Sequence, residues 1–293
     1  MAPRYRLMGI INVTPDSFSD GGAFLAADAA VAHARELDLQ GADILDVGGE
    51  STRPGAEPVS AADELERVRP VLEGIAAAGL RAQVSIDTCK AVVARAALDA
   101  GASIVNDVSA LRADPQMAGL VAERGAECCL MHMLGEPRTM QGGAGGVGGP
   151  KYNDVVDAVK AFLEERMAFA VREGIEEERI MLDPGIGFGK TVAHNLELLA
   201  RLNELTSLGR PLVVGTSRKS FLGRIAADSA GHSQPLEPAR RLPGTIATNV
   251  LALERGASVF RVHDVAPVRD ALAVAAATLG GRWTARVGTT QTS

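Results

Sequence analysis

Side chains that could do chemistry follow the apolar runs of this sequence at regular intervals. These residues are Asn12, Asp46, Glu50, Thr52, Arg53, Asp87, Asn106, Asp107, His132, Asp183, Ser217, Lys219, Arg261 and His263. A single polar residue at a strand end is often a cap or a hydrogen-bonded core group. A polar residue at the end of every run is harder to explain by structure alone, so the set predicts a binding site assembled from many segments.

Three residues of this set offer hydrogen-bond acceptors to a flat ring. Asp87, Asn106 and Asp183 are two carboxylates and an amide that follow runs in the middle of the chain. A carboxylate can accept two parallel hydrogen bonds, so such groups suit the edge of a heterocycle that carries paired N–H donors.

Four other residues carry positive charge or can acquire it. They are Arg53, Lys219, Arg261 and His263. A local group of cations can bind an anion even in a chain with a net charge of -6. The two groups together predict a ligand with a donor-rich ring at one end and phosphate at the other.

Asn12 is a neutral oxygen ligand close to the expected anion site. Mg²⁺ is usually held by one or two protein oxygens together with substrate phosphates and water, so one Asn is a sensible protein anchor. The same residue would serve equally well as a cap of the loop that follows it, and its spacing does not decide between the two roles.

Two loops are rich in Gly, Pro and small hydroxyl residues. They span residues 12–22 and 48–56, and such loops are suited to closing over a ligand and excluding water. An ordinary surface turn remains the alternative for both. The FGK sequence at residues 188–190 resembles a phosphate-binding glycine loop but lacks the full Walker spacing, which makes a nucleoside triphosphate a weak hypothesis.

A repeated pattern predicts the elements that must position these residues. An Ala-rich stretch ends at a Gly and a β-branched run begins directly afterwards, as at Gly41, Gly101, Gly125 and Gly256. A Gly just past a helix end supplies the left-handed cap, so each is interpreted as a helix-to-strand turn.

Eight apolar runs are predicted to be strands, each followed by a helix, the last helix starting near Ala266. The runs span residues 7–11, 44–47, 84–87, 104–108, 128–133, 180–183, 212–215 and 259–262. Strict alternation of eight strands and helices predicts a parallel α/β fold, a single (β/α)8 TIM barrel with its active site at the C-terminal ends of the strands. An open doubly wound sheet is the alternative. We expect residues 1–281 to form the barrel and residues 282–293 a flexible tail.

Composition narrows the class of protein further. The chain of 293 residues is 46% hydrophobic and 23% charged, which supports a large core, and its aromatic content of 3% is low for stacking on nucleic acid. No apolar stretch has the length of a signal peptide or a membrane span. The odd number of cysteines, without metal-ligand spacing, favours a reducing compartment. We therefore expect a cytoplasmic protein with small-molecule substrates and neither nucleic-acid nor membrane partners.

Eight motifs then give the sequence a family resemblance. They are MGIINVTPDSFSDGG, DVGGESTRPGA, VSIDT, IVNDVS, MHMLGEPRTMQ, LDPGIGFGK, GTSRKSFLG and FRVHDV, and they run in order from residue 8 to about residue 265. In this order they resemble the dihydropteroate synthases, pterin-binding TIM-barrel enzymes of folate biosynthesis. The resemblance implies a transferase that joins 6-hydroxymethyl-7,8-dihydropterin diphosphate to 4-aminobenzoate and releases diphosphate.

The resemblance also implies a role for individual residues. Asn12 would hold Mg²⁺, while Asp87, Asn106 and Asp183 would hold the pterin edge with Lys219 beside the ring. Arg261 and His263 would bind the diphosphate with help from Arg53, and Thr52 and Ser217 would lie near the aminobenzoate and the diphosphate. Phe188 would line the aminobenzoate channel, which Phe18 and Pro54 would close. Asp87, Lys219, Arg261 and His263 would be the catalytic group.

Two departures and two alternatives accompany the resemblance. Leu134 stands where a polar residue is expected, and the glycine-rich stretch 142–149 looks expanded. A pterin-dependent methyltransferase domain would share the barrel but needs no diphosphate site, and a paralogue that binds pterin without catalysis is the other alternative. The resemblance further implies a homodimer and competition between sulfonamides and aminobenzoate.

Overall fold

Parallel strands alternate with helices in the computed structural model, which describes residues 2–13, 23–52, 55–135 and 149–281. Over these residues the strands are β1 (Arg6–Asn12), β2 (Ile44–Gly48), β3 (Gln83–Asp87), β4 (Ile104–Asp107), β5 (Glu127–Met131), β6 (Ile180–Asp183), β7 (Val213–Val214) and β8 (Val259–Val262). All eight predicted strands are confirmed. β5 ends two residues earlier than predicted, and β7 is only two residues long.

Helices follow the strands and cover the outside of the sheet. They are α1 (Ala23–Gln40), α2 (Ala61–Ala78), α3 (Ala91–Asp99), α4 (Met117–Arg124), α5 (Val155–Arg172), α6 (Val192–Ala200), α7 (Ser220–Ser229), α8 (Leu242–Glu254) and α9 (Val265–Gly280). Side-chain caps begin three of them, since Ser60 accepts from Asp63 N at α2, Asp154 accepts from Val156 N at α5, and Thr191 accepts from His194 N at α6. The four glycines at the predicted helix-to-strand turns all have positive φ.

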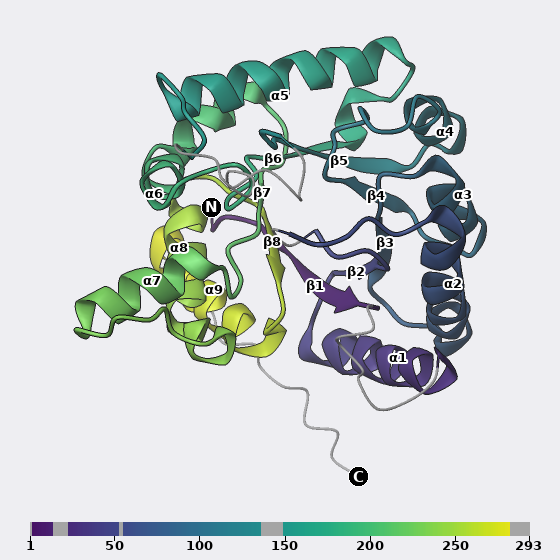
Figure 1. The fold of residues 1–293 in the computed structure, drawn as a ribbon, viewed down its shortest axis with the longest axis horizontal. Helices are drawn as coiled ribbons and strands as arrows, with labels where there is room; N and C mark the ends of the chain where they lie inside the picture. Colours follow the sequence, from purple (N-terminus) through teal and green to yellow (C-terminus); the bar gives the residue numbers. More distant parts are fainter. Residues whose placement is uncertain (1, 14–22, 53–54, 136–148, 282–293) are drawn as a thin grey trace.

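The strands close into a barrel. Their order is β6-β5-β4-β3-β2-β1-β8-β7, and every pairing between neighbours is parallel. Between the first and last strands of this order, β6 and β7, closure depends on one bridge between Leu182 and Leu212 and on a 2.9 Å bond from Leu182 N to Pro211 O. Figure 1 looks onto the ring of strands with the helices arranged around it, and the predicted (β/α)8 barrel is confirmed.

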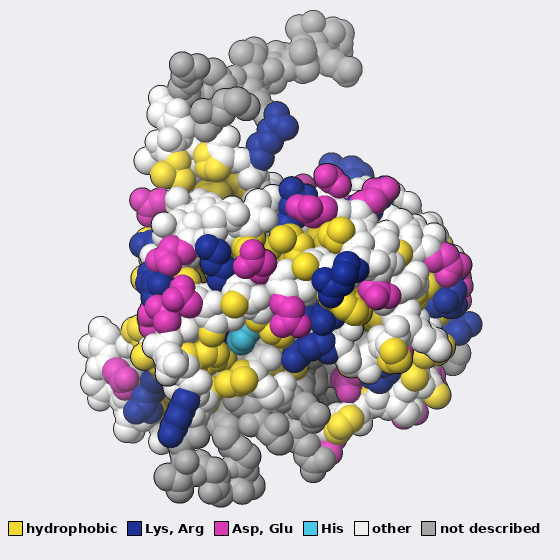
Figure 2. Space-filling model, turned by 90° about the horizontal axis from the view of Figure 1, so that it is seen from above, with side chains coloured by type: hydrophobic (Ala, Val, Ile, Leu, Met, Phe, Trp, Pro, Cys, Tyr) yellow, Lys and Arg dark blue, Asp and Glu magenta, His cyan; other side chains and the backbone are white. Residues whose placement is uncertain are grey.

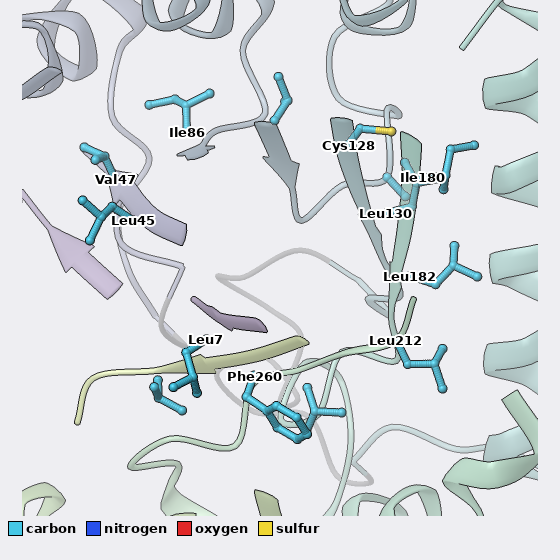
Figure 3. Close-up of a cluster of buried hydrophobic side chains, with 14 of the residues drawn as sticks. Leu7, Leu45, Val47, Ile86, Cys128, Leu130, Ile180, Leu182, Leu212 and Phe260 are labelled. Carbon is cyan, nitrogen blue, oxygen red and sulfur yellow. The ribbon is translucent and has the colours of Figure 1, made fainter. Parts of the chain in front are cut away.

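Two hydrophobic layers hold this barrel together. Inside it, buried residues from seven strands form a small apolar layer: Met8, Ile44, Ile104, Cys129, Met181, Val213 and Val259. Alternate residues of the same strands face outward and pack beneath the helices, including Leu7, Leu45, Leu130, Leu182 and Phe260. Figure 3 shows such side chains around the outside of the ring of strands.

The amino ends of the strands are closed by a small polar cluster. Arg6 Nη1 and Nη2 each lie 3.2 Å from Glu127 Oε2, Arg6 Nη1 also donates to Gln83 Oε1 at 3.2 Å, and Gln83 Nε2 donates to Glu127 Oε1 at 3.2 Å. These three residues satisfy one another, and we refer to them as the lower cluster. The barrel is thus apolar inside and polar at the amino ends of its strands.

The outer surface mixes charges of both signs. On the face drawn in Figure 2, Lys and Arg side chains are interspersed with Asp and Glu. None of the helices in the described part of the chain has the length and apolar character needed to cross a membrane. The predicted tail 282–293 and most of the glycine-rich stretch, residues 142–148, lie outside the described residues.

Candidate active site

Inward-facing polar side chains crowd the carboxyl ends of the strands. Asp46, Asn106, Asp183 and Arg261 each lie two residues after a member of the apolar layer and therefore point the same way. In the sheet register Asp87 of β3 stands beside Asn106 of β4. The alternation of the strands thus gathers residues from five strands at the end where barrel enzymes have their active sites.

Asp46 lies at the centre of this group. Its side chain is fully buried and accepts three hydrogen bonds. Ser85 Oγ donates to Oδ1 at 2.6 Å, while Asn106 Nδ2 at 3.0 Å and Arg261 Nε at 2.6 Å both donate to Oδ2. A buried carboxylate needs such partners, and here two of the donors belong to residues that the sequence assigned to the site.

Arg261 bridges Asp46 and Asp87. Its Nη2 donates to Asp87 Oδ2 at 2.7 Å in addition to the bond from Nε to Asp46. Burial raises the pKa of Asp87 to about 7, against the opposing effect of the guanidinium. Burial alone would lower the pKa of Arg261, but the carboxylates of Asp46 and Asp87 outweigh it and raise that pKa. The guanidinium stays charged and Asp87 titrates near neutral pH.

The loop after β6 begins at Asp183. Gly185 N donates to Asp183 Oδ1 at 2.6 Å, and Gly185 has a φ of +66°. A Cβ at Gly185 would lie 1.8 Å from the carbonyl oxygen of His132, so only glycine fits there. Burial raises the pKa of Asp183, and the nearby Lys219 opposes this shift.

Lys219 reaches this loop from the segment after β7. Its Nζ donates to the carbonyl oxygen of Ile186 and lies 4.3 Å from the centre of the Phe188 ring. Gly187 makes room for it, since a Cβ there would come within 2.8 Å of Lys219 Cδ. Burial lowers the pKa of Lys219 to about 8, although Asp183 favours its charged form.

An apolar wall completes this end of the barrel. Val108, Met131 and Met133 are buried together, and Cys89 and Phe188 pack against them. Burial raises the pKa of the Cys89 thiol far above its usual range, so Cys89 contributes as a neutral, apolar side chain. The wall brings an aromatic ring and flexible thioethers next to the polar groups.

Ser217 and His263 meet at the ends of β7 and β8. Ser217 Oγ lies 3.0 Å from His263 Nδ1 and accepts a hydrogen bond from His263 N at 3.1 Å. Arg218 between Ser217 and Lys219 has a φ of +57°, a strained value for a residue with a Cβ. Its guanidinium makes two bonds to Asp264, at 2.9 and 2.5 Å, which fix the segment that carries Ser217 and Lys219.

Comparison with known proteins identifies the family. Residues 8–263 match the family described as pterin binding enzyme. The dihydropteroate synthase of Escherichia coli strain K12 is 45% identical over 276 residues, covering 94% of this chain and 92% of the relative. The chain belongs to the dihydropteroate synthase family.

Solved structures of family members superpose on nearly the whole chain. A dihydropteroate synthase of Xanthomonas albilineans with 4-aminobenzoic acid has a TM-score of 0.84 at 46% identity, covering 94% of this chain and 93% of its own. A Yersinia pestis dihydropteroate synthase in a sulfonamide drug complex has a TM-score of 0.85 at 41% identity, covering 94% and 95%. The fold predicted from the alternating strands and helices and the family predicted from the motifs are both confirmed.

Two other residues assigned through the family resemblance, Asn12 and Thr52, lie at the carboxyl ends of the strands. Asn12 is the last residue of β1 and follows the inward positions Met8 and Ile10, so it faces the barrel end. Thr52 belongs to the loop after β2. Arg53, Pro54 and Phe18 lie outside the described residues. Leu134, the departure from the family motif, is 43% exposed.

Two of the polar residues that follow the predicted strands face away from the site. Asp107 follows the inward-facing Asn106 and points outward, where it accepts from Ser109 N at 2.7 Å and Leu111 N at 2.9 Å. His132 likewise follows the inward-facing Met131. A position at a strand end therefore does not by itself predict that a side chain faces the site, because successive residues of a strand face opposite sides.

His132 instead contacts a buried lysine behind the loop after β6. Lys190 Nζ lies 2.9 Å from His132 Nδ1 and donates to Gly185 O at 2.9 Å and Phe188 O at 3.0 Å. Burial lowers the pKa of Lys190 to about 7, and burial together with the Lys190 charge lowers the pKa of His132 to about 3. The imidazole is neutral and accepts the bond, so Lys190 braces the loop that carries Phe188.

Sequence reasoning missed the contributions of Ser85 and Lys190, and it gave Asp46 no role. Ser85 is recognisable only by its spacing, two residues before Asp87 and hence on the same face of β3. Lys190 was noticed only as part of a weak phosphate-loop pattern. Nothing in the linear sequence indicates that its ammonium is buried against carbonyl oxygens.

Proposed function

We propose that this chain condenses 6-hydroxymethyl-7,8-dihydropterin diphosphate with 4-aminobenzoate, forming 7,8-dihydropteroate and diphosphate. The observation that carries the proposal is the division of one barrel end into acceptors and cations, in a chain 45% identical to a dihydropteroate synthase. Asp87, Asn106 and Asp183 supply the acceptors, while Lys219 and Arg261 supply the charge.

The acceptors would hold the edge of the pterin ring. Asp87, Asn106 and Asp183 are between 6% and 8% exposed, so a ring that reaches them is largely removed from water. Hydrogen bonds to ionised acceptors are strong in such surroundings, which favours a ring edge made of N–H donors. Val108, Met131 and Met133 offer an apolar surface for the ring face.

The cations would stabilise the departing diphosphate. The bond between the pterin methylene carbon and the diphosphate oxygen breaks, and its electron pair leaves with diphosphate. Arg261 has five N–H donors, of which two contact carboxylates, and His263 lies beside Ser217 at the same rim. Fixed positive charge placed where negative charge develops is commonly the largest catalytic contribution in such sites.

The aryl amine of 4-aminobenzoate then forms the new carbon–nitrogen bond and releases one proton to solvent or diphosphate. A strong general base is unnecessary because this amine is largely unprotonated at neutral pH. The methylene carbon is electron-poor in the transition state, and ionised Asp87 offsets this charge. The family motifs assign Phe188 to the aminobenzoate channel and Arg53 to the diphosphate. They place Thr52 and Ser217 near both the aminobenzoate and the diphosphate.

Mg²⁺ fits the donor set only in partnership with the substrate. The described residues contain no group of three His, Cys, Asp or Glu side chains placed to bind a metal. Asn12 offers one amide oxygen at the rim, which suits an ion that takes its remaining ligands from phosphate and water. When bound there, Mg²⁺ would neutralise charge on the leaving diphosphate.

The direct test is an assay of diphosphate release from the two substrates, with and without Mg²⁺. We expect turnover that depends on 4-aminobenzoate, that Mg²⁺ stimulates and that a sulfonamide inhibits competitively with 4-aminobenzoate. Pterin binding without any turnover would reject the synthase and favour a paralogue that binds pterin without catalysis.

Assembly and location belong to the same proposal. We expect a homodimer, and large apolar side chains are exposed on α6, α7 and α8: Leu196 at 45%, Ile225 at 39% and Leu251 at 44%. Light scattering coupled to size exclusion would measure the mass in solution.

We place the protein in the cytoplasm, since Cys89, Cys128 and Cys129 are all free thiols and a reducing compartment keeps them so.

A further inference from the structure

The bonds around Asp46 fix the orientation of the Asn106 side chain. A carboxylate can only accept hydrogen bonds, whereas an amide has one donating and one accepting end. Because Asp46 Oδ2 lies 3.0 Å from Asn106 Nδ2, the amide turns its NH₂ group toward Asp46 and its oxygen the other way. Asn106 therefore joins Asp87 and Asp183 as a third acceptor.

Asp46 also holds Arg261 at a defined distance from Asp87. The Nε bond to Asp46 is 2.6 Å and the Nη2 bond to Asp87 is 2.7 Å, so one guanidinium is shared between two carboxylates. Without Asp46, the whole positive charge would turn to Asp87 and compete with a ligand for its oxygens. Asp46 keeps part of the Asp87 carboxylate available.

We propose that Asp46 is a positioning residue that sets the pocket to accept a ring with a donor-only edge. It acts through Asn106 and Arg261, because it is fully buried behind them and makes its bonds to them. The inference rests on the proposed function for the identity of the ring, a pterin, but its specificity argument concerns binding alone.

The test compares Asp46→Leu with Asp46→Asn. Leucine is close to aspartate in shape but has no acceptor, so the Asn106 amide loses its orientation and Arg261 its second partner. We expect the dissociation constant of 6-hydroxymethylpterin, measured by calorimetry, to rise about 10- to 100-fold. The KM for 4-aminobenzoate should stay within about threefold of the wild-type value, since Asp46 contacts none of the residues assigned to 4-aminobenzoate.

Asparagine keeps one oxygen, which can still accept from both Asn106 and Arg261 while its NH₂ group donates to Ser85 Oγ. Asp46→Asn should therefore recover most of the pterin affinity. A second ligand tests directly whether the pocket recognises a ring N–H donor. 6-Hydroxymethylpterin methylated on its ring N–H should bind wild type much more weakly than the parent compound. This discrimination should persist in Asp46→Asn and shrink in Asp46→Leu.

A purely structural role for Asp46 would lower Tm without changing the ratio between the two ligands. The proposal is overturned if Asp46→Leu keeps the wild-type ratio, or if Asp46→Asn loses it. Where Asp46→Leu folds poorly, Asp46→Ala replaces it with the same expectation.

Glu127→Gln, in the lower cluster, is the matched control and should leave both dissociation constants unchanged. Failure of wild type to turn over would reject the synthase proposal instead, because the binding ratios remain measurable.

Discussion

The two ends of the barrel are both polar, but they are polar in different ways. In the lower cluster Arg6, Gln83 and Glu127 bond to one another and remain partly exposed, with side-chain exposures of 31% for Arg6 and 24% for Glu127. At the other end Asp87 and Asp183 are buried, and burial raises the pKa of both carboxyls. The lower end is satisfied by itself, whereas the upper end holds charged groups at a free-energy cost.

This difference separates a structural end from a functional one. Groups with strongly shifted pKa values cluster where proteins bind and react, because ordinary packing gives no reason to keep a buried charge in an unfavourable state. The pKa of Lys219, lowered to about 8 at the upper end, follows the same pattern. We therefore expect substitutions at the upper end to change mainly the enzyme kinetics, and substitutions in the lower cluster to change mainly the thermal stability.

The largest effect should come from removing a cation at the upper end. Lys219→Ala and Arg261→Ala should each lower kcat/KM about 100- to 1,000-fold, because a fixed charge that stabilises the leaving group is lost. Steady-state kinetics with both substrates would measure this. Near-normal kinetics in both variants would show that the assignment of the anion site is wrong.

A smaller effect should appear as pH dependence. The Asp87 carboxyl, with a pKa of about 7, must be ionised to offset positive charge, so kcat/KM should fall as pH decreases below about 7. Lys219, with a pKa of about 8, must be protonated, so kcat/KM should also fall as pH rises above about 8. The profile is therefore a narrow bell. Asp87→Asn should remove the acidic limb from its residual activity, and an acidic limb that survives would assign it to another group.

The smallest effect is expected in the lower cluster. Arg6→Met removes the partly exposed ion pair with Glu127, which is worth about 1 kcal/mol or less and corresponds to a few degrees of Tm. Thermal unfolding would measure the change, and kcat and both KM values should equal those of wild type. A loss of activity without a loss of Tm would contradict the division between the two ends.

Sequence patterns were sufficient for the strands because buried parallel strands are continuous apolar runs with strong turn signals between them. The pterin-edge residues could also be predicted, since Asp87, Asn106 and Asp183 combine a strand end with an inward position. The position of a residue at a strand end did not show whether its side chain faces into the barrel or out of it. Counting alternate residues from Asn106 and Met131 would have separated Asp107 and His132 from the site.

The rest depends on contacts between distant parts of the chain. The bond from Arg261 to Asp46 joins residues 215 positions apart, and no local propensity encodes it. The bond between Lys190 and His132 is equally hidden, because each residue by itself resembles an exposed polar side chain. Arg53, assigned from the family motif, lies outside the described residues, so its role stays a prediction.

The narrow closure between β6 and β7 gives the barrel a preferred line of opening. Seven of the eight strand junctions are continuous ladders, whereas this one depends on Leu182 and its bonds to the chain before β7. Local unfolding starts where the fewest bonds must break, so amide hydrogens along this line should exchange with solvent sooner than those of β1 to β5. Asp183 follows on one side of the line and Ser217 and Lys219 on the other. The pocket therefore lies across the strand junction at which we expect the barrel to open first.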